Sequence, residues 1–236
     1  MPERSESGAR GRKPRKAPSA QQYEPVHFSD AVVSELHSTS RPGKAELLVQ
    51  VFAQAAAAFA AEDYREAIRL GDQAKHMALR SQSIREMLGL AHYRAGNWRE
   101  ASKELAAFRR ISGSTDQNPV IADCYRALGR PDKAVELSDE IDGRTAPAPI
   151  FYEGAIVAAG ALGDQGRLDE AIARLEDLEL RPATAQEHHV RAWYALAGLL
   201  ERRGRFTLAG EWFEAAAGAA PELTDAAERA ARLRRE

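Results

Sequence analysis

The adjacent pair His188-His189 is the first place in the chain where residue type suggests chemistry. Imidazoles are common zinc ligands, and two of them in suitable positions can hold a metal ion. Neighbouring residues on a helix, however, point about 100° apart, so this pair does not chelate as a unit. No second pair of ligands follows at a spacing of four residues. The sequence therefore predicts no metal site and no cofactor.

Cys124 is the only cysteine, which excludes a disulfide framework and a thiolate metal cage within the chain. It falls in a predicted helix, where a buried structural thiol is the expected role. The acidic pairs Asp169-Glu170 and Glu176-Asp177 fit solvated helix faces. No glycine-rich phosphate loop follows a predicted strand. Because no acid–base or nucleophile constellation is present, we predict that the chain is not an enzyme.

Basic side chains concentrate in the amino-terminal tail. Residues 1–20 carry six basic and two acidic side chains, whereas the whole chain has a formal net charge of -2. Lysine and arginine displace counterions from phosphates, so nucleic-acid contact is one interpretation. A solubilising tail is the other, because no aromatic residues interleave with the basic ones. Low apolar content predicts that residues 1–25 are disordered. The residues available for nucleic-acid contact are Arg10, Arg12, Lys13, Arg15 and Lys16.

The composition favours a helical protein without membrane segments. With 236 residues, the chain is long enough for one large domain or a short solenoid. Alanine dominates its apolar residues, which favours helix. No apolar run is long enough to span a membrane, and no apolar core follows the basic start as in a secretory signal. For a chain with one cysteine, a reducing cytoplasm is the expected compartment.

The stretch Leu88–Phe108 shows how the helices are arranged. It predicts two helices separated by a tight turn at Gly96. In the second helix, Ala101, Leu105 and Phe108 recur at steps of three and four residues, which is helical spacing. A small residue near the turn allows the two helices to approach closely.

This arrangement recurs five times along the chain. Glycine in four of the five turns fits a helix end that needs a left-handed residue. Prolines fall between the predicted hairpins or in the first turn of a helix, where they are tolerated. The small residues early in each second helix are Ala67, Ala101, Ala134, Ala171 and Ala209, at spacings of 34, 33, 37 and 38 residues.

Over about residues 45–235 the chain resembles tetratricopeptide repeat (TPR) proteins, whose period is about 34 residues. Segment 120–137 is also similar to a group of small actinobacterial TPR proteins that have no assigned biochemical role. The resemblance is closest in the last hairpin. There the TPR pattern is matched by Trp193, Leu196, Ala197, Leu200, Gly204, Phe206, Ala209, Phe213, Ala216 and Pro221.

The resemblance implies an all-α fold, a right-handed α-solenoid of about five TPR-like hairpins with a carboxyl-terminal capping helix. The solenoid and its cap span residues 45–236, after the tail at 1–25 and a short helix and linker at 26–44. The cap is expected near 222–234, because the last hairpin otherwise exposes its stacking face. The hairpins are predicted at 45–78, 82–111, 117–141, 150–180 and 185–219.

The resemblance also implies a concave groove built by the first helix of each hairpin. Three glycines in this groove would each cost up to about 1 kcal/mol relative to alanine in a helix. Either a ligand backbone approaches them, or neighbouring helices pack tightly there. The predicted groove residues are Glu86, Leu90, Tyr93, Arg94, Asp123, Arg126, Glu153, Ile156, Gly160, Gly163, Arg191, Tyr194, Gly198, Glu201 and Arg202.

The mixed charge and few aromatic residues of this groove favour a peptide or helix as its ligand and disfavour a polyphosphate. We therefore predict a non-catalytic scaffold or adaptor that holds a partner protein or peptide. The alternative is a factor associated with nucleic acid or the ribosome and anchored by the basic tail. No small-molecule substrate and no membrane association are expected.

Overall fold

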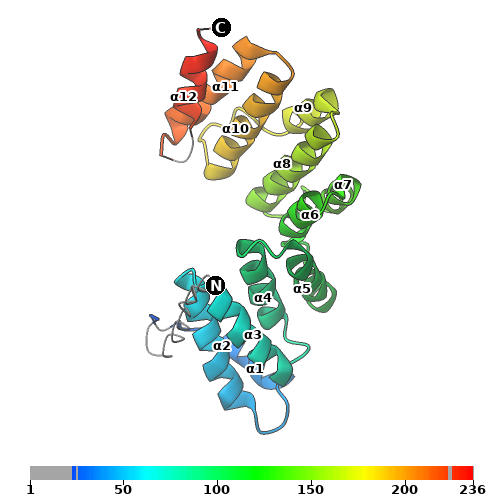
Figure 1. Ribbon diagram of the computed structural model, residues 1–236, viewed down its shortest axis with the longest axis vertical. Helices are drawn as coiled ribbons and strands as arrows, with labels where there is room; N and C mark the ends of the chain where they lie inside the picture. Colours follow the sequence, from blue (N-terminus) through cyan, green and yellow to red (C-terminus); the bar gives the residue numbers. More distant parts are fainter. Residues whose placement is uncertain (1–22, 25, 223–224, 236) are drawn as a thin grey trace, which may run out of the picture.

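The computed structural model describes residues 23–24, 26–222 and 225–235, and these residues form an arc of helices (Figure 1). This part of the chain contains twelve α-helices and no strand. No helix within it is long and apolar enough to cross a lipid bilayer. The helices are α1 Asp30–Thr39, α2 Ala45–Ala60, α3 Tyr64–Met77, α4 Gln82–Arg94, α5 Trp98–Ser112, α6 Asn118–Ala127, α7 Pro131–Asp139, α8 Ala148–Asp164, α9 Leu168–Glu176, α10 Glu187–Arg202, α11 Phe206–Ala219 and α12 Ala226–Leu233.

Ten of these helices pair as hairpins 1 to 5, which are α2–α3, α4–α5, α6–α7, α8–α9 and α10–α11. A residue with left-handed backbone ends the first helix of each hairpin. Its N–H and the next N–H donate to two carbonyls of the last helical turn at 2.9–3.0 Å. These paired bonds satisfy carbonyls that a helix end otherwise leaves open. The five left-handed residues are Glu62, Gly96, Gly129, Gly166 and Gly204.

Small residues allow the two helices of each hairpin to lie close together. In hairpin 2, a Cβ atom added at Gly89 of α4 would lie 2.4 Å from Leu105 Cγ of α5, so only glycine fits there. The α-solenoid of five hairpins predicted from the sequence is confirmed. The five alanines predicted at the start of the second helices are all fully buried: Ala67, Ala101, Ala134, Ala171 and Ala209.

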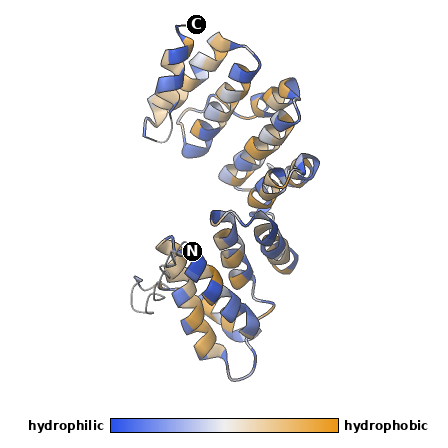
Figure 2. Ribbon diagram, in the orientation of Figure 1, coloured by the Kyte–Doolittle hydropathy of each residue, from blue (hydrophilic) through white to orange (hydrophobic). Residues whose placement is uncertain are grey.

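The buried apolar side chains form separate clusters along the arc. One cluster runs from Leu36 to Ala91 and joins α1 to α4. Another runs from Tyr152 to Leu233 and joins α8 to α12, while a small one links α6, α7 and α8. None of the three includes a residue of α5, and hydrophilic residues cover most of the visible face of α5 in Figure 2. Buried apolar side chains nevertheless continue through this region, with Leu105 and Phe108 of α5 and Ile121 of α6.

The segment before hairpin 1 covers the open end of the solenoid. The Ser29 hydroxyl group accepts the N–H of Val32 and caps the start of α1. The Phe28 ring stacks on Phe52 of α2 with 5.0 Å between ring centroids. One carboxylate oxygen of Glu35 accepts the N–H of Gln82 at 2.9 Å, which caps the start of α4. Residues that the sequence predicts as a short helix and linker thus hold hairpins 1 and 2 together.

The predicted tail, residues 1–25, lies outside the described residues except for Tyr23 and Glu24. The Tyr23 hydroxyl donates to Asp63 Oδ2 at 3.0 Å, at the turn of hairpin 1. Burial and this carboxylate raise the pKa of Tyr23. The chain is therefore attached to the solenoid already at residue 23.

A buried carboxylate connects hairpins 1 and 2. Glu104 of α5, whose side chain is 6% exposed, lies 3.1 Å from Lys75 Nζ of α3 and 2.5 Å from Arg85 Nη1 of α4. Burial alone would raise the pKa of Glu104. The hydrogen bonds from Arg85 and Lys75 outweigh it, so this pKa lies below its ordinary value of 4.5.

Glu62 is the exception among the five turn residues, with a φ of 60°. The left-handed region costs an L-residue about 1–2 kcal/mol, and glycine adopts it freely. We expect Glu62→Gly to raise the free energy of unfolding by up to about 1 kcal/mol, and Gly96→Ala to lower it by about as much. Urea titration measures both changes. A Glu62→Gly variant less stable than the wild type would contradict this account.

Glu104→Gln removes the carboxylate that faces Arg85 and leaves Lys75 with Asp72 alone, and we expect a loss of about 3 kcal/mol in the free energy of unfolding. Because the folded-state pKa of Glu104 is lowered, its stabilisation is present above the unfolded-state pKa of glutamate. It is lost as pH falls through the folded-state value. The difference in the free energy of unfolding between wild type and variant, measured by urea titration, should therefore become smaller as the pH falls. A constant difference from neutral pH to strong acid would refute the assignment.

Candidate functional site

The predicted groove residues all lie on α4, α6, α8 and α10. These helices follow one another along the inner side of the arc, and α5, α7 and α9 lie along its outer side (Figure 1). Most of the polar groove side chains bond from one hairpin to the next. They therefore form a line of contacts along the inner face.

Two hydrogen bonds cross from hairpin 2 to hairpin 3. The Tyr93 hydroxyl donates to Asp123 Oδ2, and the Gln117 side-chain amide donates to Glu86 Oε1, both at 2.8 Å. Burial and the Asp123 carboxylate raise the pKa of Tyr93, so its hydroxyl remains protonated and donates. Gln117 is absent from the predicted groove because it precedes α6, outside the helical register used for the prediction.

Arg126 connects hairpin 3 to hairpin 4. Its Nε atom donates to Asp164 Oδ2 at 2.5 Å, and its Nη1 atom lies 3.7 Å from Asp123 Oδ1. The guanidinium lies over Gly160, where an added Cβ atom would come within 2.7 Å of Nη1. Gly160 therefore makes room for an arginine of the same chain. Asp164, at the end of α8, is a further functional candidate that the helical register does not include.

Two arginines of α10 connect hairpin 5 to hairpin 4. Arg191 donates to both carboxylate oxygens of Glu153, at 3.0 and 2.8 Å. Arg202 Nη2 donates to the carbonyl oxygen of Gly163 at 2.6 Å, and a Cβ atom at Gly163 would lie 2.9 Å from Arg202 Nη1. Of the two explanations for the groove glycines, packing between repeats accounts for Gly160 and Gly163.

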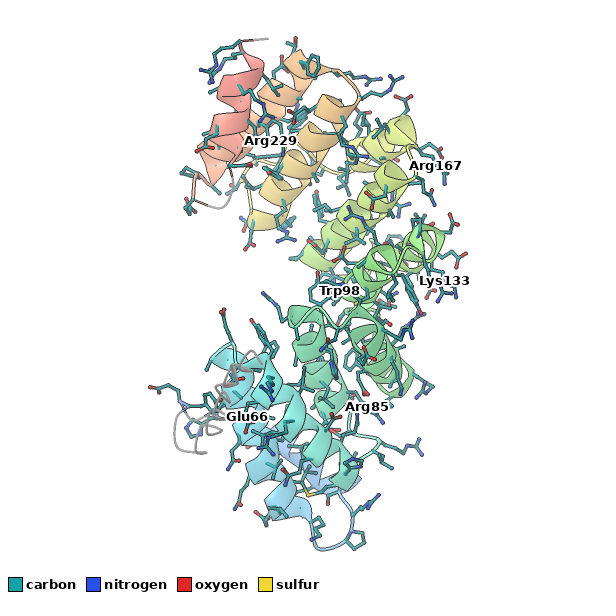
Figure 3. The ribbon with its side chains drawn as sticks, in the orientation of Figure 1. Glu66, Arg85, Trp98, Lys133, Arg167 and Arg229 are labelled. Atoms are coloured by element: carbon teal, nitrogen blue, oxygen red, sulfur yellow. The ribbon has the colours of Figure 1, made fainter. Side chains whose placement is uncertain are left out.

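The capping helix α12 closes the carboxyl-terminal end. Arg229 lies over the Phe213 ring, 4.2 Å from its guanidinium carbon to the ring centroid, and pairs with Glu201 (Figure 3). Arg232 also pairs with Glu201, at 2.5 Å. Burial alone would raise the pKa of Glu201, but the two guanidinium groups hold it below its usual value. The Tyr194 hydroxyl donates to Asp225 at 2.5 Å and so ties α10 to the start of the cap.

Four predicted groove residues neither form these bonds nor lie beneath an arginine that does. Leu90 and Ile156 are half-buried apolar side chains, and Arg94 is exposed with no ion pair among the described residues. Gly198 differs from the other groove glycines, because the nearest atom to an added Cβ would be Arg229 Nη2 at 3.7 Å. A Cβ atom at Gly198 would therefore make only ordinary van der Waals contact with Arg229.

The histidine pair begins a helix. His189 Nδ1 accepts the N–H of Gln186 at 3.0 Å, within a capping box at the start of α10. The centroids of the His188 and His189 rings lie 4.0 Å apart, and the centroid of the Tyr152 ring lies 4.6 Å from that of His188. Within the described ranges, no three His, Cys, Asp or Glu side chains gather in a way that could hold a metal ion.

Comparisons with known proteins address the fold of the chain. Residues 157–224 match the tetratricopeptide repeat family. No curated protein matches the chain. Several solved structures align with most of this chain.

TTC0263, a thermophilic TPR protein of Thermus thermophilus, is 17% identical with a TM-score of 0.61, over 80% of this chain and 100% of that one. MamA of AMB-1 is 22% identical with a TM-score of 0.51, over 76% of this chain and 94% of that one. YrrB is described as a TPR protein with an unusual peptide-binding site. It is 15% identical with a TM-score of 0.53, over 80% of this chain and 92% of that one. At these identities the likeness shows the fold.

The burial of the Cys124 thiol in α6 can be tested directly. It is fully buried, and burial raises its pKa to about 12, so it stays protonated at neutral pH. Because the thiolate is the reactive form, we expect an aromatic disulfide reagent at about pH 8 to leave the folded chain unmodified. One thiol per chain should react once guanidinium unfolds it, with Cys124→Ala as the blank. Complete labelling of the folded protein within seconds would show that the thiol is accessible.

Proposed function

We propose that this TPR protein is a non-catalytic scaffold that binds a partner protein or peptide along the inner face of α4, α6, α8 and α10. The observation that carries the proposal is the line of bonds between hairpins on that face. Tyr93, Arg126 and Arg191 are held in place before a partner arrives. A preorganised surface loses less entropy on binding. YrrB, of similar fold, is described as having a peptide-binding site.

The pairing of charges on the inner face limits what the partner can be. Glu153 and Arg191 neutralise each other, and Arg126 and Glu201 are also ion-paired, so an isolated charge on a partner gains little beside them. Leu90 and Ile156 offer apolar contact, and Tyr194 adds a half-buried aromatic ring. An amphipathic helix or an extended peptide with apolar side chains therefore fits this face better than a polyanion.

The alternative function, a factor bound to nucleic acid or the ribosome, depends on the basic tail. Its residues Arg10, Arg12, Lys13, Arg15 and Lys16 lie outside the described residues, so the proposal rests on the inner face alone. A cytoplasmic location is part of the proposal, because a reducing compartment keeps a single unpaired thiol such as Cys124 in its free form.

Gly198→Leu tests the inner face with little risk to the fold. The position has room for a Cβ atom, unlike Gly160, and leucine favours a helix over glycine by about 1 kcal/mol. The melting temperature should therefore not fall. We expect affinity purification at high salt, quantified by mass spectrometry, to recover the partner at least tenfold less with this variant than with the wild type.

Gly218→Leu is the matched control. It makes the same substitution near the end of α11, where no atom of the described residues lies within 4 Å of an added Cβ and the residue is exposed. This variant should recover the partner as the wild type does. If all three folded proteins recover every partner equally, the inner face is not the binding surface.

A further inference from the structure

A second surface lies where α5 meets α6 and α7. Two cavities of about 460 and 360 Å³ lie there, and both are lined by Ala106 and Tyr125. The two cavities therefore adjoin, and we name them together the outer cleft. Its helices α5 and α7 are on the outer side of the arc (Figure 1).

Five exposed cations surround the outer cleft. Arg99, Lys103 and Arg110 lie along one face of α5, at spacings of four and seven residues, and Arg130 and Lys133 belong to the start of α7. None of the five forms an ion pair with an acidic side chain of the described ranges. In the same part of the chain, no acidic residue lines either cavity. The outer cleft therefore carries positive charge that the described residues do not neutralise.

The Tyr125 ring forms cation–π contacts with two of these cations. The guanidinium carbon of Arg130 lies 5.2 Å from the centroid of its ring, and Lys133 Nζ lies 5.7 Å from it. An aromatic face attracts a cation without neutralising its charge. Figure 3 shows Lys133 on the outer side of the arc, away from α4 and α10. The two cations are thus held over the cleft and remain available to a ligand.

We propose that the outer cleft binds an acidic segment of a partner protein, independently of the inner face. Arginine forms paired hydrogen bonds with carboxylates, and the cations of α5 extend over about 16 Å at 1.5 Å per helical residue. That length matches about five residues of extended peptide. Single-stranded nucleic acid fits less well, because its bases stack on aromatic rings and the Tyr125 ring already carries two cations.

The test uses the full chain and a fluorescein-labelled peptide of twelve alternating glutamate and glycine residues. Fluorescence anisotropy at low salt should show saturable binding, which weakens steeply at about 0.5 M salt as screening increases. Lys103→Glu combined with Arg110→Glu should raise the Kd at least tenfold. Both side chains are exposed, so the melting temperature should stay unchanged.

Two further variants separate the cleft from general electrostatics. Arg65→Glu combined with Arg235→Glu changes the net charge equally at exposed positions that do not line the cleft, and should leave the Kd within about twofold. Tyr125→Leu keeps an apolar side chain but releases Arg130 and Lys133, and should weaken binding about twofold to fivefold.

Three results would overturn the proposal. The wild type could fail to bind the peptide at low salt. The two double variants could weaken binding equally, which would make the attraction non-specific. A twelve-nucleotide single-stranded RNA could displace the peptide and depend on Lys103 and Arg110, which would assign the cleft to nucleic acid. Gly198→Leu should bind the peptide as the wild type does, so failure of the inner-face proposal is a separate outcome.

Discussion

The turn that ends each first helix determines where the second helix lies. A left-handed residue reverses the chain, and two N–H groups close the last turn of the helix. The two helices then cross where only a small side chain fits, which is why Ala67 and its four counterparts are fully buried. Because all five hairpins repeat this turn, their first helices follow the inner side of the arc (Figure 1). The inner face and the outer cleft both follow from it.

Features that depend on local chemistry could be predicted from the sequence. Turn glycines, buried alanines and prolines between hairpins affect the backbone only within a few residues. Their spacing in the sequence therefore predicts where the helices begin and end. The predicted hairpin at 185–219 corresponds to helices that run from Glu187 to Ala219. Glu62 has the same backbone conformation as the turn glycines, and the period of the neighbouring repeats locates its turn although its residue type does not.

Contacts between hairpins could not be predicted in the same way. Arg126 is placed on the inner face by helical register, but its partner Asp164 is 38 residues away and the distance between repeats varies. Gly160 suggests a ligand until the arginine above it is located. The outer cleft could not be predicted from its cations, because Arg99, Lys103 and Arg110 have the spacing of any solvated helix face. Only the arrangement in space shows that no acidic residue of the described ranges joins them.

The order of the apolar clusters along the chain also bears on how the chain acquires its shape during synthesis. The amino-terminal cluster needs no residue beyond Ala91, so it can form while the later hairpins are still being translated. Contacts within each hairpin are close in sequence, which favours rapid folding of each unit. The bond from Tyr93 to Asp123 joins the two halves afterwards. The curvature of the arc therefore depends on contacts that form only after the later hairpins have been synthesised.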